Sequence, residues 1–236
     1  MNFVWERLAD GVHRARLAFL DVTVGLIDAA DGVLLVDAGT TLTEAEAIDA
    51  DVHAITGRPV TRIILTHKHF DHVLGATAFR GAEIYSAAEV ADYLTTAAPQ
   101  IRADALRHGT DAAEVDRATE ALRAPDHRIG DTVIDLGDRS VATRRPGGGH
   151  TGADLIVVVP PRDAADRMVV FCGDLVEESG DPMIDADSDL AAWPETLDRV
   201  LDEGGPDAIY VPGHGAVVDA EFVRRQQAWL RGKATL

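Results

Sequence analysis

The chain has 236 residues, of which 46% are apolar and 26% charged, a composition ordinary for a globular domain, and its formal net charge is −18. This acidity argues against partners bound through lysine and arginine, namely nucleic acids and anionic membrane surfaces, and the single cysteine excludes an intramolecular disulfide. Because neither a secretory signal nor an apolar run of the roughly 18 residues that span a membrane is present, we expect a cytoplasmic protein with no membrane partner.

Short strand-like runs separated by turn signals occupy the first third of the chain. Residues 22–27 show the alternation of a strand, and residues 33–36 form a continuous apolar run. The segment 41–44, Thr-Leu-Thr-Glu, has the pattern of a capping box and predicts that a helix begins there. Residues 62–65 and 83–86 are the next predicted strands.

The middle of the chain has a different composition. Residues 87–123 are rich in alanine, aspartate, glutamate and arginine and sparse in large apolar side chains. Helical periodicity is clearest over residues 88–97 and 112–122, so two or three helices are predicted here. We interpret this region as a helical insertion between two strand-rich halves.

Strands return after the insertion and alternate with two helices. The predicted strands are 132–135, 140–143, 155–159, 168–171 and 208–211, and the predicted helices are 190–201 and 221–230. Strand-rich halves with helices at intervals favour two facing sheets covered by helices, an α+β arrangement. No linker or low-complexity segment interrupts the chain, so residues 1–236 are predicted to form a single domain.

One turn carries an unusual density of side chains that bind metal ions. Six consecutive residues contain His67, His69, Asp71 and His72, directly after the apolar run 63–65 that is typical of a buried strand. Core packing does not account for three histidines and an aspartate on one strand-to-helix turn. The pattern predicts a metal site, which requires further ligands from elsewhere in the chain.

Three further strand ends offer candidate ligands. They are His150 after the run Pro-Gly-Gly-Gly, Asp174 after a glycine, and His214 between two glycines. Glycine in such a turn lets neighbouring backbone approach closely. With the first turn, these residues make seven metal-competent groups, more than one tetrahedral zinc ion uses. Two ions that share a carboxylate would use them all.

Taken singly, each of these later residues also has a structural explanation. A lone histidine after a strand is more often a hydrogen-bonded core or turn residue than a ligand, and Asp174 could equally cap a turn or a helix. The structural explanation is preferred for the remaining histidines, which we leave out of the site: His13, His53, His108 and His127.

The ordered set of motifs resembles that of the metallo-β-lactamase superfamily. His-x-His-x-Asp-His at 67–72 is followed by Gly-His-Thr at 149–151, Gly-Asp at 173–174 and Gly-His at 213–214. Val-Asp-Ala-Gly at 36–39 is similar to the first motif of the family. The resemblance implies a four-layer αββα sandwich with a metal site along one edge of the sheets.

The resemblance also implies how the ligands are divided between two metal ions. The ligands of the first ion would be His67, His69 and His150, and those of the second Asp71, His72 and His214. Asp174 would bridge the two ions. Asp37 would support the ligand turn, although a turn aspartate that caps the following helix is an equal interpretation. The implied cofactor is two Zn²⁺ per chain, with iron or manganese as alternatives.

Within the superfamily, this ligand set is similar to that of the glyoxalase II and lactonase branches. The implied function is a dinuclear metal-dependent hydrolase of a small acyl compound, a thioester, ester or lactone. A metal-bound hydroxide would be the nucleophile, and Asp71 would be the catalytic residue that orients it or accepts its proton. The main alternative is a mononuclear iron oxygenase of the sulfur-dioxygenase type. A β-lactamase is a weaker one, because the zinc β-lactamases lack an aspartate at the bridging position.

The sequence marks the substrate pocket only weakly. A tyrosine of the lactonase type would be Tyr85, Tyr93 or Tyr210. Contact with a substrate carboxylate would involve Arg102, Arg107 and His108, although a solvated helix face is the stronger interpretation. Met183 and Trp193 are further pocket candidates, with core packing favoured for Trp193. Cys172 lies in an apolar run and is interpreted as a buried structural thiol.

Overall fold

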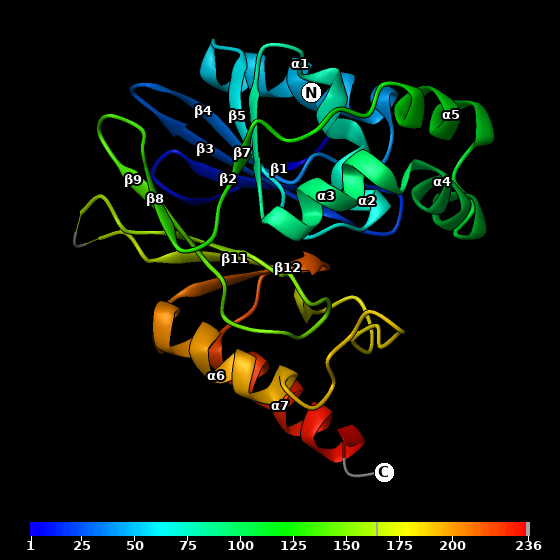
Figure 1. The fold of residues 1–236 in the computed structure, drawn as a ribbon. Helices are drawn as coiled ribbons and strands as arrows, with labels where there is room; N and C mark the ends of the chain where they lie inside the picture. Colours follow the sequence, from blue (N-terminus) through cyan, green and yellow to red (C-terminus); the bar gives the residue numbers. More distant parts are fainter. Residues whose placement is uncertain (164, 235–236) are drawn as a thin grey trace.

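The computed structural model, which describes residues 1–163 and 165–234, consists of two β-sheets packed face to face between layers of helices (Figure 1). Seven strands form the first sheet in chain order, and five strands form the second. The predicted fold class, an α+β protein with an αββα sandwich, is confirmed.

The first sheet joins an antiparallel half to a parallel half. Its strands are β1 (Trp5–Ala9), β2 (Val12–Arg16), β3 (Thr23–Ala29), β4 (Gly32–Val36), β5 (Val60–Ile64), β6 (Glu83–Ser86) and β7 (His127–Arg128). Strands β1 to β4 are antiparallel neighbours, whereas β4 to β7 run parallel. A parallel pair needs a crossover connection, and the helix α1 (Leu42–Thr56) supplies the one between β4 and β5.

The helices of the N-terminal half include those predicted from the sequence, together with a 3₁₀ helix that was not predicted. After α1 they are α2 (Phe70–Val73), the 3₁₀ helix η1 (Leu74–Ala78), α3 (Ala88–Thr96), α4 (Ala98–Arg107) and α5 (Ala112–Glu120). The predicted cap of α1 is present: the Thr41 hydroxyl accepts from the Glu44 N–H at 3.0 Å, and the Glu44 carboxylate accepts from the N–H of Thr40, one residue before the N-cap, at 2.8 Å. Three helices lie within residues 87–123. The interpretation of this region as an insertion in a single domain stays a prediction.

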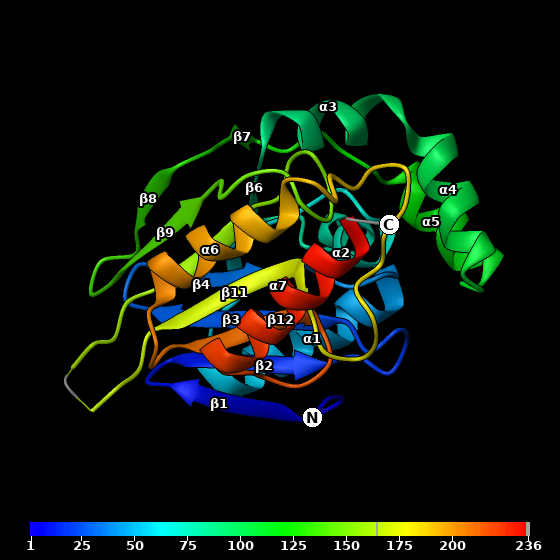
Figure 2. The same ribbon diagram turned by 90° about the horizontal axis from the view of Figure 1, so that it is seen from below.

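The second sheet is mostly antiparallel and carries two helices on its outer face. Its strands are β8 (Thr132–Asp135), β9 (Ser140–Arg144), β10 (Ile156–Val159), β11 (Val169–Glu177) and β12 (Ile209–His214), and its helices are α6 (Trp193–Gly204) and α7 (Ala220–Ala234). β11 and β12 run parallel to each other. Figure 2 shows α6 and α7 lying across this sheet, with α1 beyond the first sheet. In the described part of the chain, no helix is long and apolar enough to cross a bilayer.

The start of α6 and the N-terminal hairpin differ from the prediction. Helix α6 begins three residues late, because the backbone and side-chain oxygens of Asp189 accept hydrogen bonds from the N–H groups of Trp193 and Ala192 and form a turn ahead of the helix. Strands β1 and β2 were not predicted, because charged residues interrupt their apolar pattern. Arg14 of β2 is nevertheless buried and lies 2.7 Å from the Glu6 carboxylate on β1.

Three apolar clusters fill the spaces between the layers. Between the sheets, Leu34 and Ile64 of the first sheet belong to one cluster with Phe171 of the second. Ile48 of α1 packs in the cluster outside the first sheet, and Trp193 of α6 in the cluster outside the second. Each large side chain buried in this way contributes roughly 1.5–3 kcal/mol. The edges of the sheets that carry the candidate ligands are therefore held by a well-buried core.

The sheets approach each other closely at Gly25 of β3. A Cβ atom there would lie 2.5 Å from the Phe171 ring of β11. We expect Gly25→Ala to lower the free energy of unfolding by roughly 1–3 kcal/mol, the usual effect of overpacking a core. Urea denaturation measures this change. Gly81→Ala is the control, because a Cβ at Gly81 has no neighbour within 4 Å, and equal losses in the two variants would contradict the expectation.

Candidate metal centre

The predicted ligand turn follows directly on β5, where the parallel strands of the first sheet end. Helix α2 starts at Phe70, with His69 as its N-cap residue. The side chains on this turn are well buried: His67, Asp71 and His72 are 1%, 6% and 0% exposed. Burying such polar groups costs free energy unless they are hydrogen-bonded, paired or bound to an ion.

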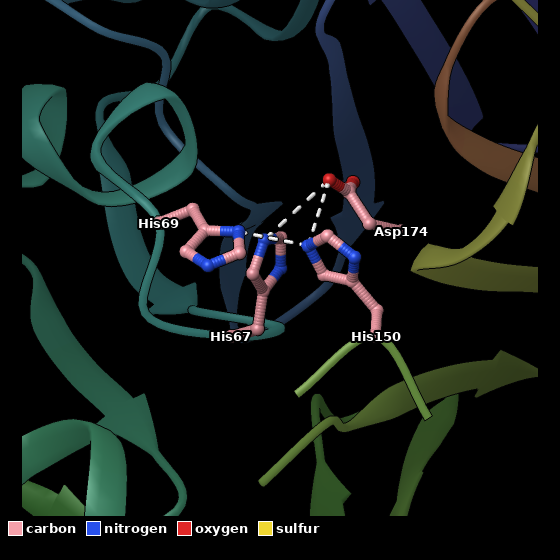
Figure 3. A group of neighbouring side chains, drawn as sticks. All are labelled: His67, His69, His150 and Asp174. Atoms are coloured by element: carbon pink, nitrogen blue, oxygen red, sulfur yellow. Dashed lines mark hydrogen bonds and ion pairs between the residues drawn. The ribbon is translucent and has the colours of Figure 1, made fainter. Parts of the chain in front are cut away.

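Asp174 of β11 lies at the centre of the converging side chains. Its Oδ2 atom is 3.6 Å from His67 Nε2, 3.3 Å from His150 Nε2 and 3.2 Å from His214 Nε2. Its Oδ1 atom is 3.1 Å from His72 Nε2. Figure 3 shows the imidazoles of His67 and His150 directed toward this carboxylate. Side chains from both sheets therefore meet around one aspartate.

The seven predicted ligands fall into two neighbouring groups, in each of which the ligand atoms lie within 4.8 Å of one another. The first group is His67, His69, His150 and Asp174, and the second is Asp71, His72 and His214. The groups touch, since Asp174 reaches His72, and in the second group His214 Nε2 lies 3.4 Å from Asp71 Oδ2. The structure thus brings all the predicted residues together, in the division that the resemblance implied. Their role as ligands stays a prediction.

Hydrogen bonds to Asp37 orient the ligand turn. Its two carboxylate oxygens accept from the Thr66 N–H and the Thr66 hydroxyl, each at 2.8 Å. The same carboxylate accepts from His72 Nδ1 at 2.9 Å, and His67 Nδ1 lies 3.0 Å from the Thr66 hydroxyl. These contacts direct Nε2 of both histidines toward the centre, which is the supporting role that the resemblance implied. The alternative role of Asp37 as a helix cap is wrong, because Thr41 caps α1.

We expect Asp37→Asn to lower the affinity for a metal ion in the second group roughly 10- to 100-fold, the usual effect of losing a carboxylate behind a ligand histidine. Asparagine tolerates the left-handed backbone of this position, where φ is +61°. Competition with a chromophoric chelator measures the affinity. Asp51→Asn is the matched control, because Asp37 and Asp51 are both 2% exposed and Asp51 accepts instead from the N–H of Asn2. Unchanged affinity in Asp37→Asn would remove Asp37 from the site.

Two histidines of the first group are held neutral by burial. Burial lowers the pKa of His67 well below its usual value and lowers the pKa of His150 to about 4. A neutral imidazole keeps the lone pair that a metal ion needs. In addition, the buried His67 Nε2 has no hydrogen-bond partner among the described residues. These observations, and a donor set of imidazoles and carboxylates, fit a divalent metal ion such as zinc.

The two imidazoles of the second group have raised pKa values. Burial acts to lower the pKa of His72, but Asp174, Asp71 and Asp37 outweigh it and place this pKa well above its usual value. Burial is likewise outweighed for His214, chiefly by Asp174, and the pKa of His214 rises to about 10. Burial acts to raise the pKa of Asp174, but the surrounding imidazoles bring it well below its usual value. Each of these imidazolium groups must lose a proton before it can bind a metal ion.

The strand positions of Asp174 and His214 differ from the prediction. Asp174 lies inside β11 rather than at its end, because pairing with β12 continues beyond a register shift between Phe171 and Gly173. His214 is the last residue of β12. A Cβ atom on Gly213 would lie 1.8 Å from Asp174 Oδ1. The strands can therefore approach this closely only with glycine at that position.

Five of the candidate ligands line a cleft of about 340 Å³: His69, Asp71, His150, Asp174 and His214. One wall comes from α4, with Asp104, Arg107 and His108. Another wall comes from the end of β11 and the segment after it, and contains Glu177, Asp181, Met183 and Asp185. Sequence reasoning missed the carboxylates of this second wall. Their only signal in the sequence is the density of aspartate and glutamate shortly after the Gly-Asp motif.

The other pocket candidates divide between the cleft and the rest of the molecule. Those that line the cleft are Arg107, His108 and Met183. Arg102 instead pairs with Asp116 on α5. Trp193 is fully buried in the core, as favoured from the sequence. Cys172 is also fully buried, and burial raises the pKa of its thiol, in agreement with a structural role.

The candidate tyrosines have other partners. Tyr85 stacks on His127 with ring centroids 4.3 Å apart, and the Tyr93 ring lies 4.7 Å from Lys68 Nζ. Tyr210 is buried, and its hydroxyl donates to a backbone carbonyl at 2.7 Å. Among the described residues that line the cleft there is no tyrosine. A lactonase-type tyrosine therefore receives no support.

The chain belongs to the metallo-β-lactamase superfamily, whose family model matches residues 17–214. The resemblance drawn from the sequence motifs is thereby confirmed. Among solved structures, FIM-1 from Pseudomonas aeruginosa in its mono-zinc form has a TM-score of 0.75 and 22% identity, over 99% of this chain and 96% of that one. The metallo-β-lactamase from Pontibacter korlensis has a TM-score of 0.73 and 20% identity, over 97% and 99%. At these identities the likeness shows the fold alone.

Curated relatives match shorter segments of the chain. The linear primary-alkylsulfatase of Pseudomonas sp. (strain ATCC 19151) is 32% identical over 68 residues, which are 29% of this chain and 13% of the relative. The metallo-β-lactamase type 2 of Bacteroides fragilis is 28% identical over 113 residues, which are 46% of this chain and 43% of the relative. The chain thus matches less than half the length of either relative. Superfamily membership and the two His/Asp groups together support a metal-dependent hydrolase.

Proposed function

We propose that this chain is a dinuclear metal-dependent hydrolase of a small acyl compound, a thioester, ester or lactone. The observation that carries the proposal is the place of Asp174, whose two oxygens reach histidines of both ligand groups. A carboxylate so placed suits two ions held side by side. The proposed cofactor is two Zn²⁺ per chain, with iron or manganese as alternatives. A cytoplasmic location belongs to the same proposal.

The side chains of the cleft have separate tasks in this reaction. When bound, divalent cations supply Lewis acidity and lower the pKa of water toward neutrality. Asp71 lines the cleft and is 6% exposed. In the proposed reaction, Asp71 orients the attacking water and accepts its proton. The only thiol, that of Cys172, is buried away from the cleft and does not act as a nucleophile.

Other reactions receive less support from this site. The two curated relatives bear the names of an alkylsulfatase and a metallo-β-lactamase. An aspartate at the position of Asp174 argues against a zinc β-lactamase, which lacks it. A sulfate ester is an anion, and the carboxylates of Glu177, Asp181 and Asp185 along the cleft disfavour it. A mononuclear iron oxygenase would use fewer of the converging side chains as metal ligands.

A substrate panel on protein of measured metal content tests the proposal. We expect turnover of at least one thioester, ester or lactone by protein that holds two equivalents of metal, and loss of turnover after chelation. Turnover of only a β-lactam or an alkyl sulfate would contradict the proposed thioester, ester or lactone substrate. One iron per chain together with oxygen consumption would favour the oxygenase instead.

Metal binding is expected to release protons at neutral pH. In the metal-free protein the pKa of His72 is raised and that of His214 is about 10, so at pH 7 a metal ion must displace the protons of both. The apparent metal affinity should therefore fall as the pH falls, and rise with pH until the pH passes about 10. Titration calorimetry in two buffers of different ionisation enthalpy counts the protons released. Binding without proton release would contradict this expectation.

A further inference from the structure

The turn from β2 to β3 contains two consecutive residues in the left-handed backbone region, neither of which is glycine. Leu20 has a φ of +55° and Asp21 a φ of +59°. Residues with a side chain rarely adopt this conformation, and they keep it only where the surrounding structure holds them, often at functional sites. The turn lies against the end of β12, since Val22 forms an isolated bridge with His214. Its backbone therefore bears on a proposed ligand of the second group.

The backbone carbonyl of Leu20 orients the ring of His214. His214 Nδ1 lies 2.7 Å from this oxygen. A carbonyl oxygen can only accept a hydrogen bond, so Nδ1 carries a hydrogen atom and donates it. Nε2, on the other side of the ring, lies 3.4 Å from Asp71 Oδ2 and 3.2 Å from Asp174 Oδ2. The contact with Leu20 thus directs Nε2 toward the other proposed ligands, as the atom available to a metal ion.

Arg14 of β2 holds the residue that follows His214. Its Nη1 atom donates to the carbonyl of Gly215 at 2.7 Å, while Nε and Nη2 lie 2.8 Å and 2.7 Å from Glu6 Oε2. A guanidinium group suits such bridging, because its donors point in fixed directions. The Gly215 N–H in turn donates to the carbonyl of Asp21 at 3.2 Å. Both main-chain groups of Gly215 and the ring of His214 are therefore tied to the first sheet.

Pairing within the N-terminal hairpin does not by itself explain why Arg14 is buried. Arg14 is 5% exposed, and burying a guanidinium group costs free energy unless its donors are satisfied. The hairpin already has an ion pair at its surface, Arg16 with Asp21, whose side chains are 45% and 32% exposed. Such an exposed pair avoids the cost of burial. The burial of Arg14 is explained by its contact with Gly215, which joins the first sheet to the end of the second.

We propose, resting on the hydrolase function above, that Arg14 is a positioning residue for His214. Together with the left-handed turn, it holds the imidazole ring in the orientation that binding of the second metal ion requires. Without the guanidinium group, the carbonyl of Gly215 loses a charged donor, and charge-assisted hydrogen bonds are the stronger kind. The ring of His214 then leaves the carbonyl of Leu20 more readily, and Nε2 loses its fixed direction.

Hydrogen exchange of the imidazole N–H groups tests this inference, followed by NMR on the zinc-loaded chain with isotope-labelled histidine. We expect Arg14→Met to speed exchange of the His214 Nδ1–H at least about tenfold, the size of the effect of one lost buried hydrogen bond. The Nδ1–H of His72, which donates to Asp37, is the internal reference and should keep its exchange rate. Arg14→Lys retains a charged donor, so its rates should stay closer to those of the unmodified protein.

Metal affinity gives a second measurement, by competition with a chromophoric chelator. In Arg14→Met one ion should bind roughly tenfold more weakly, the lower end of the effect of a group behind a metal ligand, while the ion of the first group keeps its affinity. Arg139→Met is the matched control, because Arg139 is 8% exposed and donates to the carbonyl of Asp10 at 2.9 Å, before the start of β2. It should lower the free energy of unfolding but leave both affinities and both exchange rates unchanged.

Selective acceleration at His214 in Arg14→Met supports the inference. Equal acceleration at His214 and His72 would overturn it, because Arg14 would then stabilise the fold in general, and so would unchanged rates at both. A His214 Nδ1–H that exchanges without protection in the unmodified protein would also overturn it. The proposed function fails separately: an unmodified protein that holds a single ion, or that cleaves no acyl compound, contradicts the dinuclear hydrolase, while the exchange rates still decide whether Arg14 positions His214.

Discussion

Replacing Asp174 with asparagine is expected to release at least one metal ion and to lower kcat/KM by more than about 100-fold, since even residues behind a metal ligand contribute roughly 10- to 100-fold. Asp174 is 8% exposed, and its oxygens face the Nε2 atoms of four histidines. An amide has a single oxygen acceptor and no charge. It cannot serve both ligand groups, and it leaves the neighbouring imidazolium groups of the metal-free protein without their counter-charge.

Metal content, measured by atomic emission, and steady-state kinetics on the best substrate of the panel check this expectation. Asp49→Asn is the control, because Asp49 is exposed on α1 and the substitution is the same. It should retain metal and activity. If Asp174→Asn kept two equivalents of metal and normal activity, Asp174 would not be a shared ligand, and the two-metal proposal would lose the observation that carries it.

Replacing Trp193 with alanine is expected to lower the free energy of unfolding by about 3–5 kcal/mol, the usual loss for a large aromatic side chain in a core. Trp193 is fully buried, and its Nε1–H donates to the backbone carbonyl of Leu175 at 3.0 Å. Its ring also meets the ring of His150 edge-on, with centroids 5.8 Å apart. Leu175 adjoins Asp174, so the substitution loosens the support of two proposed ligands as well as the core.

Urea denaturation of the metal-free protein measures this loss, because a bound ion would add its own stabilisation. Trp193→Phe should recover most of the stability, since phenylalanine fills much of the same volume. Trp229→Ala is the control, because Trp229 is only partly buried in the same cluster. This variant should lose less of the free energy of unfolding than Trp193→Ala. Equal stability of the two alanine variants would mean that the core closes around the smaller side chain at position 193, so that burial of Trp193 contributes no more than that of Trp229.

The strands show which local patterns are sufficient to predict structure. The predicted strand at 132–135 has the bounds of β8, and the one at 83–86 has the bounds of β6, because continuous or alternating apolar runs suit a buried sheet in any context. The hairpin of β1 and β2 was missed, because its pattern contains charges. Arg14 is 5% exposed and is paired with Glu6 across the hairpin and with the backbone carbonyl of Gly215, and such partners are a property of the folded chain.

The side chains competent to bind metal are recognisable from sequence, because the turn from His67 to His72 and the histidines next to glycine, His150 and His214, are local patterns. The meeting of Asp174 with both ligand groups, and the place of Glu177 beside Asp174 and His214, become visible in the folded chain alone. Both facts depend on the packing of two sheets whose strands are far apart in the chain. The position of one side chain against another across that interface is set by long-range packing, for which a single sequence carries no local signal.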